Sequence, residues 1–410
     1  MKIATREIIR EIDSKTIDHY GISGLILMEN AGRASANLIL SEYSKAKRIA
    51  IICGEGHNGG DGFVIARHLI SAEKDVKTYL LTDKSKYKGD SKINLHSLIK
   101  IGGDISELKS KSSRIKEADI YVDAIFGTGL DREVDGFYKK IINYLNTRKE
   151  PVVSIDIPSG LDSNSGKPLG AAVKAASTIT FIKPKIGMCI YPGVAYVGKL
   201  FITDITTPKI LENDIKSELI TFDSCKKLFK ARINNTHKGT YGHLFILAGS
   251  KGKSGAAILS TNAAVKTGTG LVTVGIPKGI NKAIEKNCIE AMSIPLDETD
   301  EGTFSDNTLN KILQIMKDKK TALAIGPGIT TNGETKILIK KILLESKMQM
   351  VLDADALNII SEDINILKKI KPDIILTPHP GEMARLTNLS NNDVQNNRIE
   401  IAREFAKKYG

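Results

Sequence analysis

The sequence predicts an α/β protein with two doubly wound parallel sheets. Short β-branched runs alternate with segments of helical spacing along both halves of the chain, which is typical of parallel sheets. The chain has 410 residues, which exceeds the usual size of a domain built on a single hydrophobic core. We therefore expect two domains. Most of the predicted strands run into a loop that carries glycine, an acid or histidine.

Composition narrows the class of protein. A hydrophobic content of 41% with 26% charged residues is ordinary for a globular chain. The four cysteines have no C-x-x-C spacing, which argues against a zinc site or disulfide framework and favours a cytoplasmic protein. No run approaches the roughly 20 apolar residues of a membrane helix. The net charge of +12 comes largely from scattered lysines on predicted helix faces, so we expect neither a nucleic-acid nor a membrane partner.

The first half begins with two predicted helices. Thr5 is a suitable N-cap for a helix with regularly spaced apolar residues, and Gly21 is placed to end it. A second helix follows from Leu25, and its small residues allow close packing on a sheet. Glu29 and Asn30 are the polar residues of this helix that could face a site.

A glycine-rich turn follows the first predicted strand. Residues 49–53 form a β-branched run, and residues 62–70 carry apolar side chains at helical spacing. Between them lie several glycines with His57, Asn58 and Asp61. Glycines at this place let the backbone approach an anion at the helix N-terminus. The amide and the carboxylate beside them indicate, in addition, cation coordination or proton chemistry.

Two later strands of the first half end in acids. Asp123 precedes a glycine loop, and Asp156 precedes a turn that contains Ser159. Because loops at the carboxyl ends of parallel strands converge, we expect these residues to meet Asn58 and Asp61 in one crevice. Such a set of oxygen-bearing side chains favours a hard cation, a general base, or both.

The second half repeats the alternating pattern after a linker. Residues 206–235 are charged and weakly periodic, and we place the domain boundary so that residues 1–217 and 218–410 form the two domains. His379 lies between two prolines, and we expect it to contact a ligand. The predicted strands with their loops are residues 244–248, 270–275, 322–328, 350–358 and 374–382.

Motifs in both halves resemble a known family. The first half contains Leu27-Met-Glu-Asn-Ala-Gly32, Gly56-His-Asn-Gly-Gly-Asp-Gly62, Asp123-Ala-Ile-Phe-Gly-Thr-Gly-Leu130 and Ile155-Asp-Ile-Pro-Ser-Gly-Leu-Asp162. The second contains His237-Lys-Gly239, Gly326-Pro-Gly328, Val351-Leu-Asp-Ala-Asp-Ala-Leu-Asn358 and Leu376-Thr-Pro-His-Pro-Gly-Glu-Met-Ala-Arg-Leu386. The first set resembles the NAD(P)H-hydrate epimerases, and the second is similar to the ADP-dependent NAD(P)H-hydrate dehydratases. Their tandem order resembles the bifunctional repair enzymes.

The resemblance implies a Rossmann-like epimerase domain followed by a ribokinase-like domain. The epimerase would interconvert the R and S hydrates of NADH or NADPH at the ring carbon that bears the hydroxyl. The dehydratase would phosphorylate the S hydroxyl from ADP and eliminate phosphate. The implied substrate is the small molecule NAD(P)H hydrate, the implied cofactors are a potassium ion and ADP, and magnesium is a further candidate. Because epimerase-like domains often dimerise, the resemblance also suggests a homo-oligomer.

The family pattern also implies roles for individual residues. Asn58, Asp123 and Ser159 would hold potassium, and Asp156 would be the acid–base group. The residues expected to contact substrate in the first half are His57, Asn58, Gly59, Gly60, Asp61, Gly127, Thr128, Gly129, Leu130, Asp131, Arg132 and Glu133. In the second half they are Ala256, Gly328 and His379.

The chain departs from the family pattern at three places. His57 replaces a common asparagine, and Ala176 stands where an aspartate is usual. The closing segment of the dehydratase, with its nucleotide-binding strand and Gly-x-Gly-Asp helix start, does not follow Gly410. From this we expect a ribokinase-like domain that lacks its last elements, and impaired dehydration.

Three alternatives remain open at the level of sequence. A small-molecule kinase with a ribokinase-like fold would explain the second half but leave the acids of the first half without a role. A non-catalytic scaffold would not need Asn58, Asp61, Asp123 and Asp156. An NAD-dependent dehydrogenase would fit a Rossmann-like sheet, but the end of the glycine loop is wrong for its fingerprint.

Overall fold

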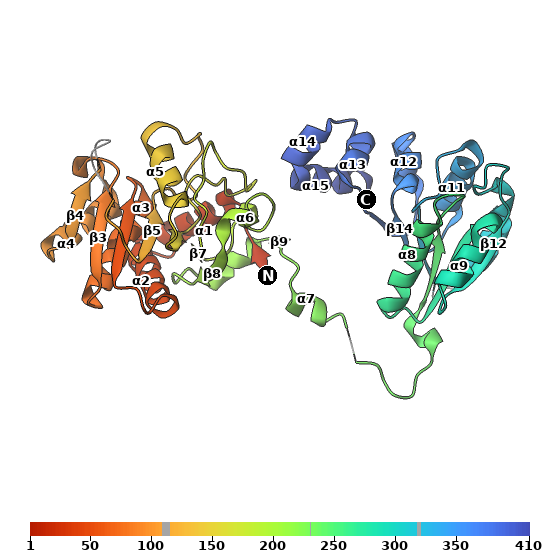
Figure 1. Ribbon diagram of the computed structural model, residues 1–410, viewed down its shortest axis with the longest axis horizontal. Coiled ribbons are helices and arrows are strands. Elements are labelled where there is room, and N and C mark those ends of the chain that lie inside the picture. Colours follow the sequence, from red (N-terminus) through yellow and green to blue (C-terminus); the bar gives the residue numbers. More distant parts are fainter. Residues whose placement is uncertain (109–114, 230, 318–320) are drawn as a thin grey trace. The chain divides into compact units, whose positions relative to one another are not determined.

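The computed structural model describes residues 1–108, 115–229, 231–317 and 321–410. The chain forms two compact units, Met1–Lys230 and Ala231–Gly410, each with its own sheet and core (Figure 1). This division comes later than the predicted boundary after residue 217. The physical reason is that Ser217–Glu218 forms strand β9, which pairs antiparallel with β1 of the first unit.

In the first unit, the described residues form a seven-stranded sheet of order β4-β3-β2-β5-β6-β7-β8, and all of its neighbouring strands are parallel. The strand order reverses between β2 and β5, and such a switch point opens a crevice at the carboxyl ends of the strands. The strands of this unit are β1 (Lys2–Ile3), β2 (Arg48–Cys53), β3 (Asp75–Leu80), β4 (Asp104–Glu107), β5 (Ile120–Ala124), β6 (Val152–Ile155), β7 (Ser177–Phe181), β8 (Lys199–Thr203) and β9 (Ser217–Glu218).

Helices cover both faces of this sheet. Because successive strand residues point to opposite faces, Ile51 packs with side chains of α1 to α4, whereas Ile52 packs with side chains of α5. The helices are α1 (Arg6–Asp18), α2 (Gly24–Glu42), α3 (His57–Ser71), α4 (Gly89–Lys100), α5 (Gly136–Asn146), α6 (Val194–Val197) and α7 (Phe222–Lys226).

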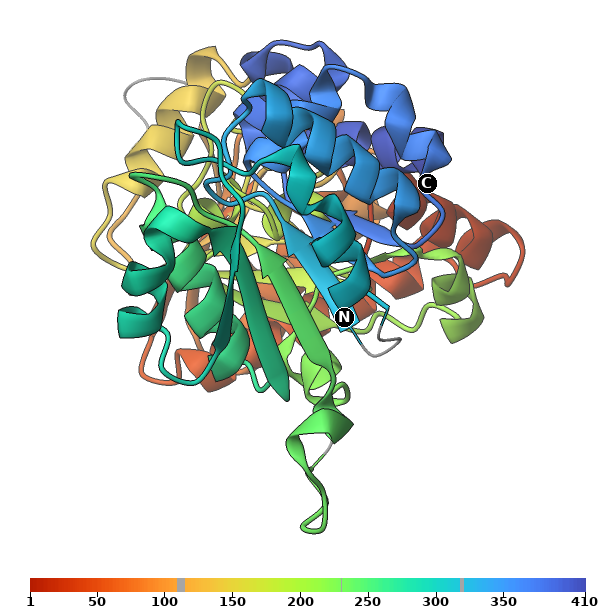
Figure 2. The ribbon, with the colours of Figure 1, turned by 90° about the vertical axis from the view of Figure 1, so that its right-hand side faces the viewer.

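The second unit repeats this architecture with a parallel sheet of order β12-β11-β10-β13-β14-β15 among its described residues, and its switch point lies between β10 and β13. Figure 2 turns this unit toward the viewer and shows helices on both sides of its strands. The strands are β10 (His243–Leu247), β11 (Leu271–Pro277), β12 (Met292–Leu296), β13 (Thr321–Ile325), β14 (Met350–Leu352) and β15 (Ile374–Leu376). The helices are α8 (Ser254–Lys266), α9 (Asn281–Asn287), α10 (Leu309–Ile315), α11 (Gly333–Glu345), α12 (Asp355–Ser361), α13 (Pro380–Thr387), α14 (Asn391–Asn396) and α15 (Arg398–Tyr409).

The predicted α/β class with two doubly wound sheets is confirmed. Thr5 caps α1 as expected, because its hydroxyl accepts a hydrogen bond from the Ile8 amide. One helix start was predicted too late, since α3 begins at His57 and takes the Asn-Gly-Gly-Asp motif into its first turns.

Strands β4, β8 and β12 were not predicted. These three strands lie at sheet edges, and none of their residues except Leu296 is fully buried.

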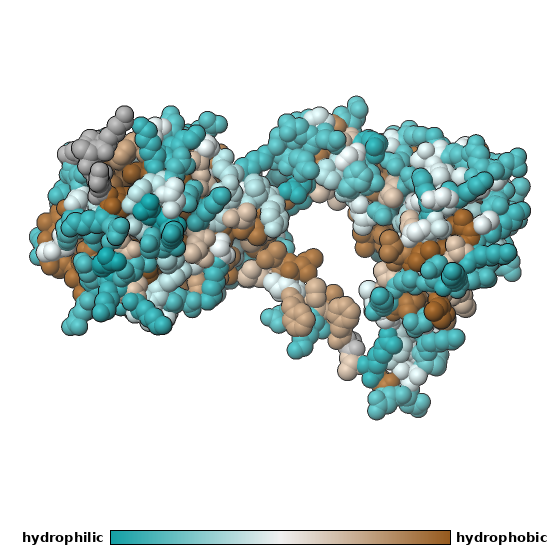
Figure 3. All heavy atoms as spheres, viewed as in Figure 1, coloured by the Kyte–Doolittle hydropathy of each residue, from teal (hydrophilic) through white to brown (hydrophobic). Residues whose placement is uncertain are grey.

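The segment that leads from the first unit into the second carries exposed apolar side chains. Phe222 of α7 and Leu228 are about four-fifths exposed, at 79% and 80%. Figure 3 shows apolar residues gathered over this segment. Among the described residues, none of the helices has the length and apolar character needed to cross a membrane.

Close backbone contact joins the first turn of α3 to the neighbouring strand. A Cβ atom added at Gly54 would lie 2.0 Å from the carbonyl oxygen of Ile125, and one added at Gly59 would lie 1.9 Å from the carbonyl oxygen of Gly54. Both contacted oxygens are backbone atoms, which cannot move aside by a change of rotamer. Gly54 and Gly59 are therefore needed to bring Asn58 next to the loop that follows β5.

We expect Gly54→Ala to destabilise the first unit by about 1–3 kcal/mol or more, because the added methyl group overpacks a rigid backbone contact. Gly56→Ala is the matched control in the same turn, since nothing lies within 4 Å of its added Cβ atom. Urea unfolding of both variants measures the difference. Equal midpoints would contradict the packing argument.

Candidate active site

Asp123 lies at the carboxyl end of β5 and is fully buried. Its Oδ2 accepts hydrogen bonds from the Ser154 hydroxyl at 2.7 Å and the Ser159 amide at 2.9 Å. Its Oδ1 accepts from the Ser159 hydroxyl and, at 3.3 Å, from the Ile125 amide. Burial raises the pKa of Asp123 even though these donors favour its ionised form. The carboxyl therefore ties the loops after β5 and β6 together.

Asn58 and Asp61 enter the same crevice from the first turns of α3. Both side chains are buried, and neither the oxygen nor the nitrogen of the Asn58 amide has a hydrogen-bond partner within the described part of the chain. Burial, with the nearby charge of Asp156, raises the pKa of Asp61 well above its usual range. Burial therefore favours the protonated form of Asp61. The Asn58 amide is available to a ligand.

Asp156 follows β6 and forms an ion pair with a buried lysine. The ammonium of Lys185 contacts Asp156 Oδ1 and donates to the Thr180 hydroxyl at 2.8 Å, and the Lys185 side chain is 0% exposed. Asp156 Oδ2 accepts from the Thr128 amide at 3.3 Å. Its backbone has a φ of +66°, a strained value for a residue other than glycine. Such strain is typical of functional positions.

The loop of residues 127–133 begins beside Asp156 and Asn58. A Cβ atom at Gly127 would lie 3.2 Å from Asp156 Oδ2 and 3.5 Å from Asn58 Cβ. Leu130 holds the loop in place, because its carbonyl oxygen accepts a hydrogen bond from Arg6 Nη1 at 2.9 Å. Of the other predicted residues, Gly59 and Gly60 are buried in α3, Thr128 is half-buried, and His57, Gly129, Asp131, Arg132 and Glu133 are exposed.

The structure thus brings together the predicted set of Asn58, Asp61, Asp123, Asp156 and Ser159 at the switch point. The group offers oxygen donors only, including the unpartnered Asn58 amide oxygen, which suits a hard cation such as potassium. Among the described residues, no group of three or more histidine, cysteine, aspartate or glutamate side chains is placed to hold a metal ion.

Two charged residues of this site were not predicted from the sequence. Lys185 follows β7, and Asp13 lies half-buried on α1. Lys185 stands in a turn, and a lysine in a turn is usually a surface residue. Asp13 had no signal beyond its position beside buried Ile12, because exposed acids are common on helices.

Glu29 and Asn30 of α2 have structural contacts. Glu29 contacts Arg67 and accepts a hydrogen bond from His68 Nε2 at 2.8 Å, and these contacts lower the pKa of Glu29 although burial opposes them. Asn30 donates to the Thr206 hydroxyl at 2.9 Å. Both residues fasten α2 to its neighbours.

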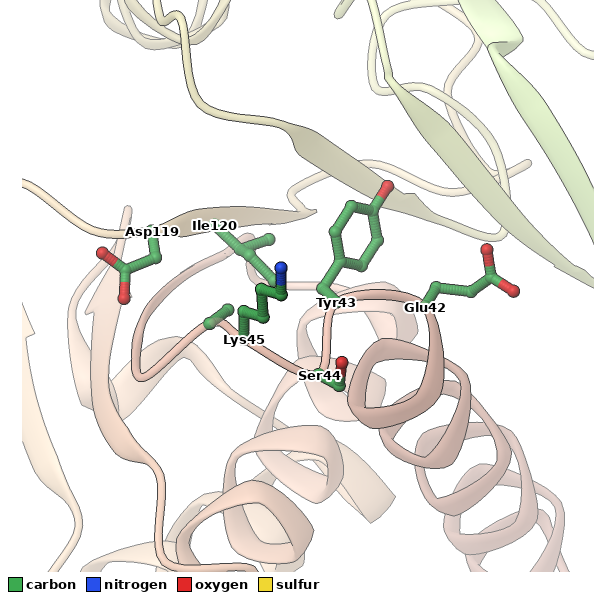
Figure 4. Close-up of a pocket in the computed structure, with 7 residues that line it drawn as sticks. Glu42, Tyr43, Ser44, Lys45, Asp119 and Ile120 are labelled. Atoms are coloured by element: carbon green, nitrogen blue, oxygen red, sulfur yellow. The ribbon is translucent and has the colours of Figure 1, made fainter.

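A separate hollow of about 420 Å³ lies near the amino end of β5, away from the carboxyl-end crevice. Figure 4 shows its residues at the end of α2 and the start of β5. They are Glu42, Tyr43, Ser44, Lys45, Ala46, Asp119 and Ile120. Asp119 forms an ion pair with the Arg48 guanidinium at 2.7 Å, and the Tyr43 hydroxyl forms a hydrogen bond with the Ser177 hydroxyl at 2.8 Å. These contacts are structural.

In the second unit, two of the predicted residues meet at the switch point. A Cβ atom at Gly328, which has a φ of +73°, would lie 3.2 Å from Cβ atoms of Ala256 and Lys253. The Lys253 ammonium lies 3.7 Å from Asp355 Oδ2, which also accepts from the Thr330 amide at 2.9 Å. Gly328 and Ala256 therefore line one crevice beside a lysine and an acid.

His379 is used locally as a helix cap. Its Nδ1 accepts from the Gly381 amide at 3.1 Å, and Glu382 reaches back to the His379 amide at 2.9 Å. The imidazole is 63% exposed. Both hydrogen bonds are made within the first turn of α13. The contact of His379 with a ligand stays a prediction.

Comparison with known proteins gives the same division into two parts. The family model described as YjeF-related protein N-terminus matches residues 24–187, and the one described as NAD(P)H-hydrate dehydratase matches residues 244–410. The bifunctional NAD(P)H-hydrate repair enzyme Nnr of Moorella thermoacetica is 35% identical over all of this chain and 79% of its own. The relative of the same name from Thermofilum pendens is also 35% identical, over all of this chain and 78% of its own. The chain belongs to the bifunctional NAD(P)H-hydrate repair enzymes.

Two solved structures each match about half of this repair-enzyme chain. A yeast protein shares 23% identity over 55% of this chain and 97% of its own, with a TM-score of 0.47. The ADP/ATP-dependent NAD(P)H-hydrate dehydratase of Bacillus subtilis, crystallised with ATP and Mg²⁺, shares 29% identity over 46% of this chain and 62% of its own, with a TM-score of 0.38.

The departure of this repair-enzyme chain at Ala176 lies away from the crevice. Ala176 precedes β7 at the amino end of the sheet, where its amide donates to the Val152 carbonyl at 2.8 Å and its carbonyl accepts from the Lys199 amide at 3.0 Å. A carboxylate at this position would be at the opposite end of β7 from Lys185.

We expect Asp61→Asn to raise the unfolding temperature at pH 8 by about 2–4 °C. Because the folded protein raises the pKa of Asp61, it binds a proton that the unfolded chain releases near pH 4, and stability is lost as pH rises from there through the folded pKa. The amide removes this loss, so the gain should shrink toward pH 4. Exposed Asp75, changed to Asn, is the control. A variant less stable than the wild type at pH 8 would contradict this account.

Proposed function

We propose that the first unit epimerises the R and S forms of NAD(P)H hydrate and that the second unit carries out the ADP-dependent dehydration of the S form. The impaired dehydration expected from the sequence stays a prediction. The observation that supports epimerisation most directly is the ion pair of Asp156 with the buried Lys185, beside Asp61, whose pKa burial raises, and an unpartnered Asn58 amide. The names of the relatives support both activities.

The chemistry of the hydrate explains why such a site suits it. Inversion at the hydroxyl-bearing carbon requires that a bond to this carbon break and form again from the other face. The ring nitrogen can push out the hydroxyl, which takes up a proton and leaves as water. Water then adds to the other face of the C=N bond and loses a proton. The site must therefore supply one proton and accept another.

We assign the acid–base role to Asp156 and substrate contacts to residues 57–61 and 127–133. In support, Asp156 is held by Lys185 and Thr128 and lies beside Gly127, so its carboxylate has a fixed orientation at the loop. Burial raises the pKa of Asp61 and so favours the form that has a proton to donate. A carboxylate and a carboxylic acid in one crevice meet both requirements of the reaction.

We assign the potassium site to Asn58, Asp123 and Ser159. The fit is supported by the unpartnered Asn58 amide and by the pairing of Asp123 with Ser159. A bound cation would favour the ionised form of neighbouring carboxyl groups. In the second unit, we assign substrate contacts to Ala256, Gly328 and His379, with magnesium as a further candidate cofactor.

We also place this protein in the cytoplasm, where a reducing environment keeps thiols free. In support, all four cysteines, Cys53, Cys189, Cys225 and Cys288, are free thiols in the structure.

A coupled assay tests the two activities separately. The protein is given a mixture of R and S NADH hydrate, with ADP and an authentic dehydratase either added or withheld, and recovery of NADH absorbance is followed. Recovery of the R fraction beyond the spontaneous rate, with the external dehydratase present, supports the epimerase. Recovery of the S fraction when only ADP is added supports the dehydratase. Failure of either arm would reject that activity.

We expect Asp156→Asn to slow epimerisation by about 10²–10⁴-fold, the usual contribution of a positioned acid–base group. The control is Asp135→Asn, because Asp135 is exposed and its side chain does not cap α5. Both variants are measured in the coupled assay with external dehydratase. Unchanged epimerisation in Asp156→Asn would show that the role belongs to another residue of the crevice.

We expect Asn58→Ala to raise the potassium concentration needed for half-maximal epimerisation by at least about tenfold. Potassium should also stabilise the wild type against heat more than it stabilises this variant, because ligand binding favours the folded state. The control is Asn143→Ala on the exposed face of α5. An equal potassium response in Asn58→Ala would contradict the assignment.

A further inference from the structure

The N-terminal segment of the first unit contacts three loops at the carboxyl end of its sheet. The amide and the carbonyl of Ala4 bond to the backbone on both sides of Lys185, at 3.0 and 2.9 Å, in the turn after β7. The Arg6 amide donates to Asn164 Oδ1 at 2.8 Å, in the loop after β6. Arg6 Nη1 donates to the Leu130 carbonyl at 2.9 Å, in the loop after β5. The start of α1 is therefore fastened to the loops that form the crevice.

Arg6 is itself held in position. Its side chain is only 18% exposed, and its Nε lies 3.4 Å from Glu7 Oε1. Glu7 is fixed in turn, because Asn164 Nδ2 donates to its Oε2 at 3.0 Å. The guanidinium thus extends from a helix start whose backbone and neighbouring side chains are already bonded, so little rotamer freedom is lost when it donates to a loop.

The substrate loop of residues 127–133 has few other attachments. Its first end is held at Thr128 and the chain beyond it at Val134, whose amides donate at 3.3 and 2.8 Å to groups outside the loop. Between them, Leu130 packs partly against an apolar cluster, and the other residues of the stretch 129–133 are exposed. Within the described residues, the bond from Arg6 is the hydrogen bond that joins this stretch to the rest of the unit.

We propose that Arg6 is a positioning residue for substrate binding, which holds the loop of residues 127–133 in its receiving conformation before the hydrate binds. This inference rests on the epimerase function proposed above, which assigns substrate contacts to this loop. A loop that is ordered in advance loses little further conformational freedom on binding, so more of the binding free energy is kept. Without the bond to Leu130, the hydrate would have to order the loop itself.

The expected effect of Arg6→Met is on KM rather than on kcat. Methionine keeps an apolar stem but removes the donor, so KM for R-NADH hydrate should rise by about tenfold, as expected for one lost hydrogen bond from a charged donor. The value of kcat should stay within about twofold, because Asp156 is held by Lys185 and Thr128. A rise in KM at constant kcat indicates lost binding. Arg6→Lys keeps a cationic donor and should recover most of the wild-type KM.

The experiment is the coupled epimerase assay with excess external dehydratase and ADP, in which R-NADH hydrate is varied and the spontaneous rate is subtracted. Wild type, Arg6→Met, Arg6→Lys and Arg10→Met are compared. Arg10→Met is the matched control, since Arg10 is an exposed arginine of the same helix.

Limited trypsin digestion is a second measurement, and it requires no epimerase activity. Arg132 is an exposed residue of the loop, and cleavage after it reports local opening. In the wild type this cleavage should be slower than cleavage after exposed Lys227 in the segment between the two units. In Arg6→Met it should be several-fold faster than in the wild type, and in Arg10→Met it should be unchanged.

A higher KM at nearly constant kcat in Arg6→Met, reversed in Arg6→Lys and absent in Arg10→Met, would support the inference. Unchanged kinetics, a fall in kcat at constant KM, or the same effect in Arg10→Met would overturn it. If Arg6→Met does not fold, wild-type cleavage after Arg132 as fast as after Lys227 would overturn it. An inactive wild type would reject the epimerase function, and the digestion would then decide whether Arg6 holds the loop.

Discussion

Burial of Asp123 is the constraint on which the site of the first unit depends. A buried carboxyl without partners would cost several kcal/mol, and in this protein hydrogen bonds from Ser154, Ser159 and Ile125 offset that cost. Those donors come from the strand that carries Asp123, the neighbouring strand and the turn after it. Satisfying one buried acid therefore fixes the relative position of the loops that present Gly127 and Asp156.

The same crevice contains groups that reduce stability. Asp61 is buried with its pKa raised, the Asn58 amide lacks a partner among the described residues, and Asp156 has a positive φ. Functional sites commonly keep such features at the expense of stability. The Lys185 ammonium partly offsets the cost of these acids, because it forms an ion pair with Asp156 and also donates a hydrogen bond to Thr180.

Both units use one topological solution. In each sheet the strand order reverses beside the first strand of the unit's parallel sheet, and the glycine-rich turns after the two central strands meet there. In the first unit these turns present Asn58 and Gly127, and in the second they present Ala256 and Gly328. The chemistry of the two units differs because the loops after these central strands carry different side chains.

The sequence by itself determined the fold class, the convergence of the loops that follow the strands and most acids of the first site. Its buried strands are strongly β-branched, and glycines, acids and strand ends recur together, so convergence at one edge followed from parallel topology. Edge strands such as β4 were missed because they are only half-buried and lack this signal. The start of α3 was placed too late, because glycines that serve close packing looked like a loop.

Only the tertiary structure decided which charges share the crevice. Asp13 lies on a helix and Lys185 in a turn, far apart in sequence, and neither position is distinctive locally. The pairing of Ala4 with the backbone around Lys185 brings the start of α1 beside this turn. Protonation in a buried cluster depends on the number of carboxyls and cations within it. That number is a property of three-dimensional packing, and no local pattern of residues contains it.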